Sequence, residues 1–414
     1  MKTKPIPHAR KAKRSKKQRL ARAALVSVVL SGVMGYGFLR VPWVAPLCAD
    51  IARQVVGPAA VAKLEDKAYG LADSYNQWRY KGTPPPSYWA SSSEAAPCAA
   101  STPPPTAGPP VPTDDGGALV PLVEARAFPP ADFTPAISSV AGKADGKWIA
   151  LADDVEPAAP TVMAKTLVHP DAARSYAQVA IVAIDLAGVR ISAVPGTEEP
   201  ASTTVKREER PGKIPDTDQP RLIAAFNGGW QAIHGGFGMM VDGRELLPPK
   251  EPSCTIVLYK NRGMRIAPWL DVAEERESMQ AFRQTPPCLV TAGVENTGLS
   301  EGSKSWGAAV DGATVIRRSA LGLAGDRKTL FYGSGDSLSA LTLAQAMKTA
   351  GAVDVAELDV NWSFPRFLFY KHGAAIPEVR DSLIPCSFRK NEHTGISYHR
   401  DYFYVVREAA IAQR

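Results

Sequence analysis

The sequence predicts an α+β fold, a mixed, hairpin-rich sheet with few helices, preceded by one transmembrane helix. Turn residues flanked by apolar runs occur at 242–243, 261–263 and 325–326, which is the pattern of β-hairpins. Within the C-terminal two thirds, one clear helix pattern follows Asp336 and ends at Gly351. An uncharged run directly follows a basic N-terminus. Hairpins with few helices argue against a doubly wound parallel sheet.

The N-terminal segment, residues 1–22, is strongly basic. It contains ten basic residues and no acidic one, and the whole chain has a formal net charge of +7. The remaining chain is therefore slightly acidic, which argues against a nucleic-acid partner. The positive-inside rule predicts that residues 1–22 form a cytoplasmic tail.

Residues 23–46 are predicted to anchor the chain in a membrane. The run from Ala23 to Leu39 has no charge, and as a helix it would be about 26 Å long, which Trp43 and its apolar neighbours extend. A cleaved signal peptide is the rival interpretation. The one small-x-small cleavage candidate, Gly35 to Gly37, lies inside the apolar run, so the uncleaved anchor is preferred. The domain after the anchor would then be periplasmic or extracellular.

Two further segments connect the anchor to the domain. Within residues 47–81, apolar side chains recur at alternating spacings of three and four, which predicts an amphipathic helix: Val61, Leu64, Ala68, Leu71, Tyr75 and Trp78. It would serve as a short stalk or lie on the membrane or on the domain. Residues 82–127 are rich in Pro, Ser and Ala and predict an extended linker.

The five cysteines indicate a disulfide more than a metal site. They are Cys48, Cys98, Cys254, Cys288 and Cys386, and none forms a C-x-x-C pair. In an oxidising compartment, a disulfide among the last three is expected, with the pairing left open. The sequence predicts no metal site and no cofactor, and leaves a metal requirement undecided.

The domain, residues 128–414, contains three stretches that could carry chemistry. The first is Asn227-Gly228-Gly229-Trp230, where exposed amides could hold an anion or sugar oxygens, although a plain turn has the same pattern. His234 follows as a candidate acid, base or ligand. In the second, Arg317 and Arg318 must point to opposite faces of a strand, so one needs a partner on the core side.

The third stretch is residues 357–364, in which polar and apolar residues alternate. Such a period of two predicts a β-strand, whose polar face would present Glu357, Asp359, Asn361 and Ser363. That face could be solvated or could line a pocket, and the alternation alone does not distinguish the two.

Taken in order, stretches between about residues 160 and 408 resemble the phosphodiester glycosidase domain family, found in the uncovering enzyme and in bacterial envelope proteins. They are AAFNGGW…GGFGMMVDG, RRSALGLAGD, LTLAQAMKTAGAVDVAELD and DYFYVV. The family's Asn-Gly-Gly-Phe is matched by Asn227 to Trp230, and its Arg-Ser/Thr-Ala by Arg318 to Ala320. Its Leu-Asp-Gly-Gly-Gly-Ser corresponds to Leu358 to Ser363, in which Val360, Asn361 and Trp362 replace the glycines.

The resemblance implies cleavage of a sugar-1-phosphodiester at the anomeric carbon. Asp359 would be the catalytic carboxylate, and Arg318 would hold the charge of the leaving phosphate. The substrate-binding residues would be Asn227, Gly228, Gly229, Trp230, Asn361, Trp362 and Ser363. His234, Asp242 and Glu357 are weaker candidates, since a hairpin turn accounts for Asp242 and a structural ion pair for Glu357.

Two alternatives to an enzyme remain. Without the glycines the pocket should be narrower, so the domain could bind an envelope glycan or sugar phosphate without cleaving it. A scaffold that presents the domain to a protein partner is the third hypothesis.

Overall fold

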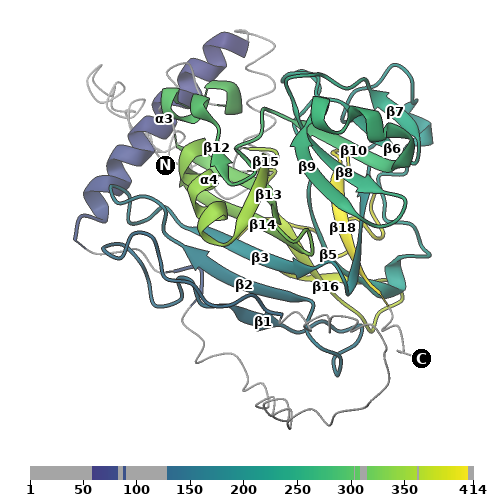
Figure 1. Cartoon of the computed structure of the whole chain (residues 1–414), viewed down its shortest axis with the longest axis horizontal. Helices are drawn as coiled ribbons and strands as arrows, with labels where there is room; N and C mark the ends of the chain where they lie inside the picture. The colour runs from purple at the N-terminus through teal and green to yellow at the C-terminus, as the bar shows by residue number, and fades with distance from the viewer. Residues whose placement is uncertain are drawn as a thin grey trace, which may run out of the picture. The chain divides into compact units, whose positions relative to one another are not determined.

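The computed structural model describes residues 58–82, 87–89, 128–302, 304–307, 315–360 and 363–408. These residues form a sheet-rich α+β structure that contains two α-helices and several short 3-10 turns (Figure 1). The helices and strands have these bounds: α3 Pro58–Arg79, β1 Ile149–Leu151, β2 Met163–Val168, β3 Val179–Asp185, β4 Val189–Val194, β5 Leu222–Asn227, β6 Met239–Val241, β7 Arg244–Leu247, β8 Cys254–Tyr259, β9 Met264–Pro268, β10 Met279–Thr285, β11 Val290–Thr291, β12 Val294–Glu295, β13 Ile316–Ala324, β14 Thr329–Leu338, α4 Ala340–Thr349, β15 Ala352–Glu357, β16 Phe367–Lys371, β17 Glu378–Ser382 and β18 Tyr402–Arg407.

The strands form three sheets. The largest has the order β1-β2-β3-β14-β13-β15-β11-β12, and two five-stranded sheets have the orders β7-β6-β10-β8-β9 and β17-β16-β5-β18-β4. The three predicted hairpins are confirmed as β6–β7, β8–β9 and β13–β14. The prediction of a mixed sheet was wrong, because every pair of named strands is antiparallel.

Helix α4 covers one face of the largest sheet. Its buried side chains, Leu343, Ala344 and Met347 among them, pack in one cluster with Ile181 of β3 and Phe331 of β14. The helix begins later than the sequence suggested, because β14 continues through Leu338. Ser339 therefore provides the N-cap, accepting a hydrogen bond from the Thr342 amide at 3.1 Å.

The other face of the largest sheet contributes to a core shared with strands of the two smaller sheets. Phe226 of β5 lies at its centre, with ring centroids 5.2 Å from Tyr332, 5.6 Å from Phe367 and 5.4 Å from Phe403. Phe226 belongs to the strand that leads into Asn227 to Trp230. This aromatic cluster therefore fixes the base of the predicted glycine turn.

Part of the predicted organisation lies outside the described residues, including the tail 1–22 and the anchor 23–46. None of the helices among the described residues is both long enough and apolar enough to span a bilayer. Of the predicted linker, Gly82 and residues 87–89 are described, and residues 87–89 pack against the domain. There the Tyr88 hydroxyl lies 3.2 Å from Asp336, and the Lys165 ammonium lies 4.3 Å from the centroid of the Trp89 ring.

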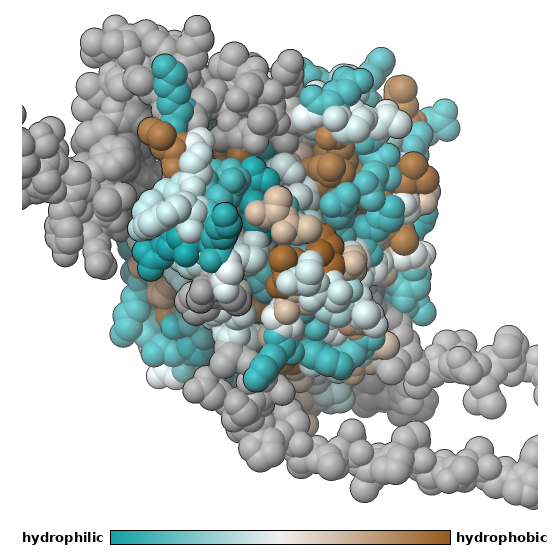
Figure 2. Space-filling model, turned by 90° about the vertical axis from the view of Figure 1, so that its left-hand side faces the viewer, coloured by the Kyte–Doolittle hydropathy of each residue, from teal (hydrophilic) through white to brown (hydrophobic). Residues whose placement is uncertain are grey.

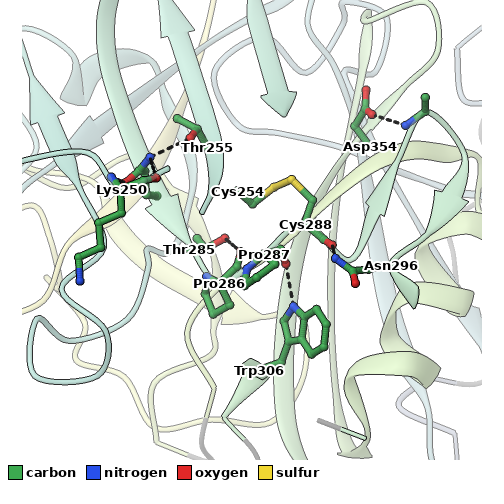
Figure 3. The surroundings of a disulfide bond; sticks show 12 residues. Lys250, Cys254, Thr255, Thr285, Pro286, Pro287, Cys288, Asn296, Trp306 and Asp354 are labelled. Atoms are coloured by element: carbon green, nitrogen blue, oxygen red, sulfur yellow. Dashed lines mark hydrogen bonds between the residues drawn. A yellow bond between two sulfur atoms is a disulfide. The ribbon is translucent and has the colours of Figure 1, made fainter. Parts of the chain in front are cut away.

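The predicted disulfide joins Cys254 at the start of β8 to Cys288, and Cys386 is free (Figure 3). The segment that carries Cys288 is held on both sides. The Trp306 indole donates to the Pro287 carbonyl at 2.7 Å, and the Asn296 amide donates to the Cys288 carbonyl at 3.0 Å. The disulfide therefore links the β7-β6-β10-β8-β9 sheet to the loop that leads into β11.

Replacing Cys254 with serine should lower the free energy of unfolding by about 3–4 kcal/mol, because it releases a 34-residue loop in the unfolded chain. Denaturant unfolding under non-reducing conditions measures this. Cys386→Ser is the matched control and should leave the free energy of unfolding nearly unchanged. Equal losses in the two variants would contradict the prediction.

The face of the molecule shown in Figure 2 is mostly hydrophilic, with hydrophobic residues in small separate groups. Isolated apolar residues are ordinary on protein surfaces. Exposed apolar side chains that align on one element are less ordinary, and α3 carries three of them, Leu71, Tyr75 and Trp78.

Candidate active site

Three segments that are far apart in the sequence meet beside the ends of β5, β15 and β18. They are Asn227–Trp230 at the end of β5, Leu358–Asp359 after β15, and Arg400–Asp401 before β18. The Asp359 amide donates to the Gly228 carbonyl and the Gly228 amide donates to the Asp401 carbonyl, both at 3.0 Å. The three segments are thus connected through their backbones.

The strand predicted over residues 357–364 is wrong: β15 ends at Glu357, where the alternating pattern begins. Leu358 follows the last residue assigned to the strand and is fully buried in the core. Its amide donates to the Ser319 carbonyl at 2.8 Å, and its carbonyl accepts the Trp230 indole N–H at 2.8 Å. Local alternation predicted a strand, but from the Leu358 carbonyl onward the backbone bonds to the glycine turn instead of the β13 backbone, as the Trp230 and Gly228 contacts show.

Asn227 is held entirely by protein groups. Its amide nitrogen donates to the Ser319 hydroxyl at 3.0 Å, and its oxygen accepts from the Tyr332 hydroxyl at 2.9 Å and from the Arg366 amide at 3.1 Å. A residue so fully engaged fixes the glycine turn. Its role in orienting a sugar hydroxyl stays a prediction, and the contacts shown here are structural.

The two glycines that follow allow charged side chains to approach the backbone. A Cβ at Gly228 would lie 2.1 Å from Oδ2 of Asp401, and one at Gly229 would lie 2.7 Å from Cζ of Arg283. Neither approach is sterically possible for another residue without movement of buried groups. The Gly229 amide instead donates to Asp401 Oδ2 at 2.8 Å.

Arg283 and Asp401 form a fully buried ion pair beneath this turn. The guanidinium Nε lies 2.8 Å from Asp401 Oδ2. Its other N–H groups donate to the second Asp401 oxygen and to the carbonyls of Trp230, Phe237 and Gln284, so all five donors are used. This pair fixes the glycine turn and has no donor left for a ligand.

Asp359 and Arg400 form a second ion pair above the first. Arg400 Nη2 donates to Asp359 Oδ2, and the Val360 amide donates to Oδ1 at 2.9 Å. Burial raises the pKa of Asp359 to about 6, although the Arg400 charge and the Val360 hydrogen bond act in the opposite direction. Carboxylates with a pKa in this range are typical of acid–base sites.

Arg400 has an unused donor beside this carboxylate. Its Nε–H is buried and has no hydrogen-bond partner among the described residues. The guanidinium carbon lies 4.2 Å from the centroid of the Phe364 ring, and the exposed His399 lies edge-on to that ring at 6.3 Å. Phe364 therefore covers one side of Arg400, and the Nε–H next to Asp359 stays unpaired among the described residues.

Arg318, predicted to hold the leaving phosphate, does not join this cluster. Ser319 faces Asp359, so Arg318 points to the opposite face of β13. There it is fully buried, pairs with Glu357 at 2.7 Å, and donates to the carbonyls of Leu338 and Trp306. Burial raises the pKa of Glu357 to about 7, against the opposing effect of Arg318. Arg317 pairs with Asp336 at 2.6 Å.

The remaining predicted residues do not converge on one pocket. Trp230 is buried, with its indole N–H bonded to Leu358, so it cannot stack on a sugar in this arrangement. His234 is exposed in the loop after Trp230, and Asp242 lies in the β6–β7 turn with φ 50°. Ser363 is half-buried, and its carbonyl accepts from Arg366 at 2.7 Å. Asn361 and Trp362 lie outside the described residues.

The sequence interpretation missed Arg283 and Arg400 and did not single out Asp401. Arg400 and Asp401 lie at the start of the DYFYVV stretch, whose order along the chain was the available signal. Arg283 had none, because it lies within a strand, β10, whose sequence shows nothing unusual. Arg283 and Arg400 pair with Asp401 and Asp359, which are far from them or unremarkable in the sequence, so no local pattern reveals these ion pairs.

Two hollows are lined by described residues, and the more enclosed of these two does not include Asp359 or Arg400. It has a volume of about 310 Å³ between β4 and the β7-β6-β10-β8-β9 sheet, and Asp242 is the one predicted site residue along it. A shallower hollow lies closer to Asp359 and includes Glu198, Arg207 and His399. Among the described residues, no group of three or more His, Cys, Asp or Glu side chains is placed to hold a metal ion.

No family model matches this chain, and no curated protein matches it. Similar solved structures include the catalytic domain of zebrafish N-acetylglucosamine-1-phosphodiester alpha-N-acetylglucosaminidase, auto-inhibited by its pro-peptide (12% identity, TM-score 0.38, covering 63% of this chain and 88% of that one). Another is a hypothetical protein from Synechocystis (10% identity, TM-score 0.37, 61% and 65%). A third is a protein from Burkholderia pseudomallei described as a "putative exported protein" (11% identity, TM-score 0.31, 60% and 75%). These values indicate a distant structural similarity only.

Proposed function

We propose that this chain is a membrane-anchored, glycosidase-like hydrolase that cleaves a sugar-1-phosphodiester of an envelope or extracellular glycan. One observation carries the proposal: the buried Asp359 carboxylate is paired with Arg400, whose Nε–H has no acceptor among the described residues. A carboxylate and a free cationic donor at one point suit a substrate that joins a sugar to a phosphate.

The roles follow from the charges that develop during the reaction. The bond between the anomeric carbon and the phosphate oxygen breaks, the sugar gains oxocarbenium character, and water supplies the new oxygen. Asp359 stabilises the positive charge and acts as the base for water or as the nucleophile. The phosphate leaves as a weak base that needs little protonation, and Arg400, not Arg318, holds its charge.

The location of the enzyme is part of the same proposal. Residues 1–22 lie in the cytoplasm, residues 23–46 cross the membrane, and residues 128–414 act in the periplasm or outside the cell. The basic tail supports this orientation, and the Cys254–Cys288 disulfide supports an oxidising compartment. The partner is a glycan or sugar phosphate and not a nucleic acid.

Hydrolysis should depend on pH through Asp359. We expect kcat/KM to rise with pH and to level off above about 6, because the carboxylate works in its ionised form. The raised pKa means that the folded protein holds this proton more tightly than the unfolded chain. The contribution of Asp359 to stability is therefore complete below about pH 4 and is lost as the pH rises through about 6. A pH–rate profile with an acidic limb near pH 4 would contradict the assignment.

The proposal is tested by incubating the full chain with a panel of sugar-1-phosphodiesters and measuring the free sugar released. Release from at least one member that saturates with substrate supports the enzyme. The replacement of the family's glycines by Val360 and its neighbours favours one alternative, a glycan-binding module. Saturable binding without turnover across the panel would establish that alternative and overturn catalysis.

A further inference from the structure

Helix α3 contacts the domain through a polar side. Asp73 forms two hydrogen bonds with the Arg174 guanidinium, Nε to Oδ1 at 2.9 Å and Nη2 to Oδ2 at 2.8 Å, and it also accepts from the Tyr176 hydroxyl. The Tyr80 ring just beyond the helix packs 5.8 Å from the Tyr176 ring. These contacts fix which side of α3 faces the domain.

The opposite side of the same helix is apolar and exposed. Leu71, Tyr75 and Trp78 are 73%, 52% and 73% exposed. At about 100° per residue they lie within an arc of about 60°, roughly opposite Asp73. The helix is therefore oriented against the usual rule, with a carboxylate toward the protein and an apolar row toward its surroundings.

Basic side chains border this row. Lys67 and Arg79 are exposed on the helix, and Arg79 donates to the Tyr75 hydroxyl at 3.3 Å; Lys81, just beyond the helix, is exposed as well. The Asp73 carboxylate is turned away and is neutralised by Arg174. Tryptophan and tyrosine beside exposed basic residues match the interface of a bilayer that contains anionic lipids.

The length of chain between the proposed anchor and α3 indicates that a bilayer is the apolar environment close to this helix. The proposed membrane span ends at residue 46, and α3 begins at Pro58. The intervening residues can extend at most about 40 Å, and any less extended path brings α3 closer to the bilayer. This distance argument rests on the membrane anchor of the proposed function.

We propose that α3 lies on the outer surface of the anchoring membrane, with Leu71, Tyr75 and Trp78 inserted among the lipid head groups. Because Asp73 and Arg174 hold the helix against the domain, this contact fixes how the domain is oriented toward the membrane. A glycan that is itself attached to the envelope would then meet the domain in one orientation.

The test uses the full chain reconstituted into vesicles of phosphatidylcholine and phosphatidylglycerol. The emission of Trp78 is obtained as the difference between the unaltered chain and Trp78→Phe. We expect lipids brominated near the head groups to quench most of this emission, and aqueous acrylamide to have little effect. Trp269→Phe is the matched control, because Trp269 is buried in the domain and its emission should respond to neither quencher.

Each outcome decides a different point. If Trp78 is quenched by acrylamide and not by brominated lipid, the row is solvated and the inference is overturned. If neither quencher acts, a protein surface covers the row, and a bilayer contact is likewise overturned. Flotation of the vesicles at high salt tests the anchor separately. A chain that floats with Trp78 solvated overturns the α3 contact alone, and a chain that does not float overturns both.

Discussion

Asp359→Asn should abolish release of sugar from a sugar-1-phosphodiester while the chain remains folded. Asparagine has no charge to stabilise an oxocarbenium-like transition state and cannot act as base or nucleophile. We expect kcat/KM to fall by at least about 100-fold, the lower end for loss of a general base. The assay is release of free sugar by the full chain at a pH above the raised pKa of Asp359.

The fold should tolerate this change better than most changes to a buried charge. The amide oxygen can still accept the Arg400 N–H, and the raised pKa of Asp359 shows that burial already disfavours its ionised form. Asp354→Asn provides the matched control at the other end of β15, where the side chain accepts the Ala292 amide at 2.8 Å. It should retain full activity. Full activity in Asp359→Asn would rule out the assigned role.

Asp401→Ala should cause the largest loss of stability of any substitution considered for this chain. It leaves the fully buried Arg283 without its counter-ion and removes the acceptor of the Gly229 amide. Breaking a buried ion pair on one side costs about 3–5 kcal/mol, which is a large share of the stability of an ordinary domain. Denaturant unfolding with the disulfide intact measures the change.

The matched control is Glu198→Ala, which breaks a surface pair with Arg207. There the side chains are 52% and 65% exposed, and the loss should stay below about 1 kcal/mol. The double variant Arg283→Met with Asp401→Leu should recover part of the loss, since no charge is then left unpaired. If Asp401→Ala is as mild as Glu198→Ala, the pair does not hold the glycine turn.

Features that depend on local chemistry were predictable from the sequence. Asp242 adopts φ 50° and Arg262 φ 69° in their hairpin turns, as expected of turn positions that need left-handed backbone. Helix α4 followed from its apolar spacing, and its start was misplaced only because β14 continues to Leu338.

The strand predicted over residues 357–364 failed for a tertiary reason. Its alternation was real, but the pairing with β13 ends where the Leu358 amide bonds to Ser319, and the Leu358 carbonyl already accepts from Trp230 of the glycine turn. These partners lie about 40 and about 130 residues away along the chain, so no window of sequence contains them.

The candidate site was predictable in part. Asp359 and the turn at Gly228 do meet, as the ordered resemblance suggested. The face that Arg318 occupies could not be predicted, because two adjacent strand arginines look alike in sequence, whereas Ser319 decides which face meets Asp359. Arg400 could not be found, because its pairing with Asp359 exists only once β18 lies beside β5.

The central claim is that the bond at the anomeric carbon is the one that breaks. Hydrolysis of a sugar-1-phosphodiester by the full chain in oxygen-18 water tests it most directly, with mass spectrometry of both products. We predict that the heavy oxygen appears in the anomeric hydroxyl of the released sugar and that the phosphate monoester is unlabelled. Label in the phosphate would show cleavage at phosphorus and would contradict the assignment of Asp359 and Arg400.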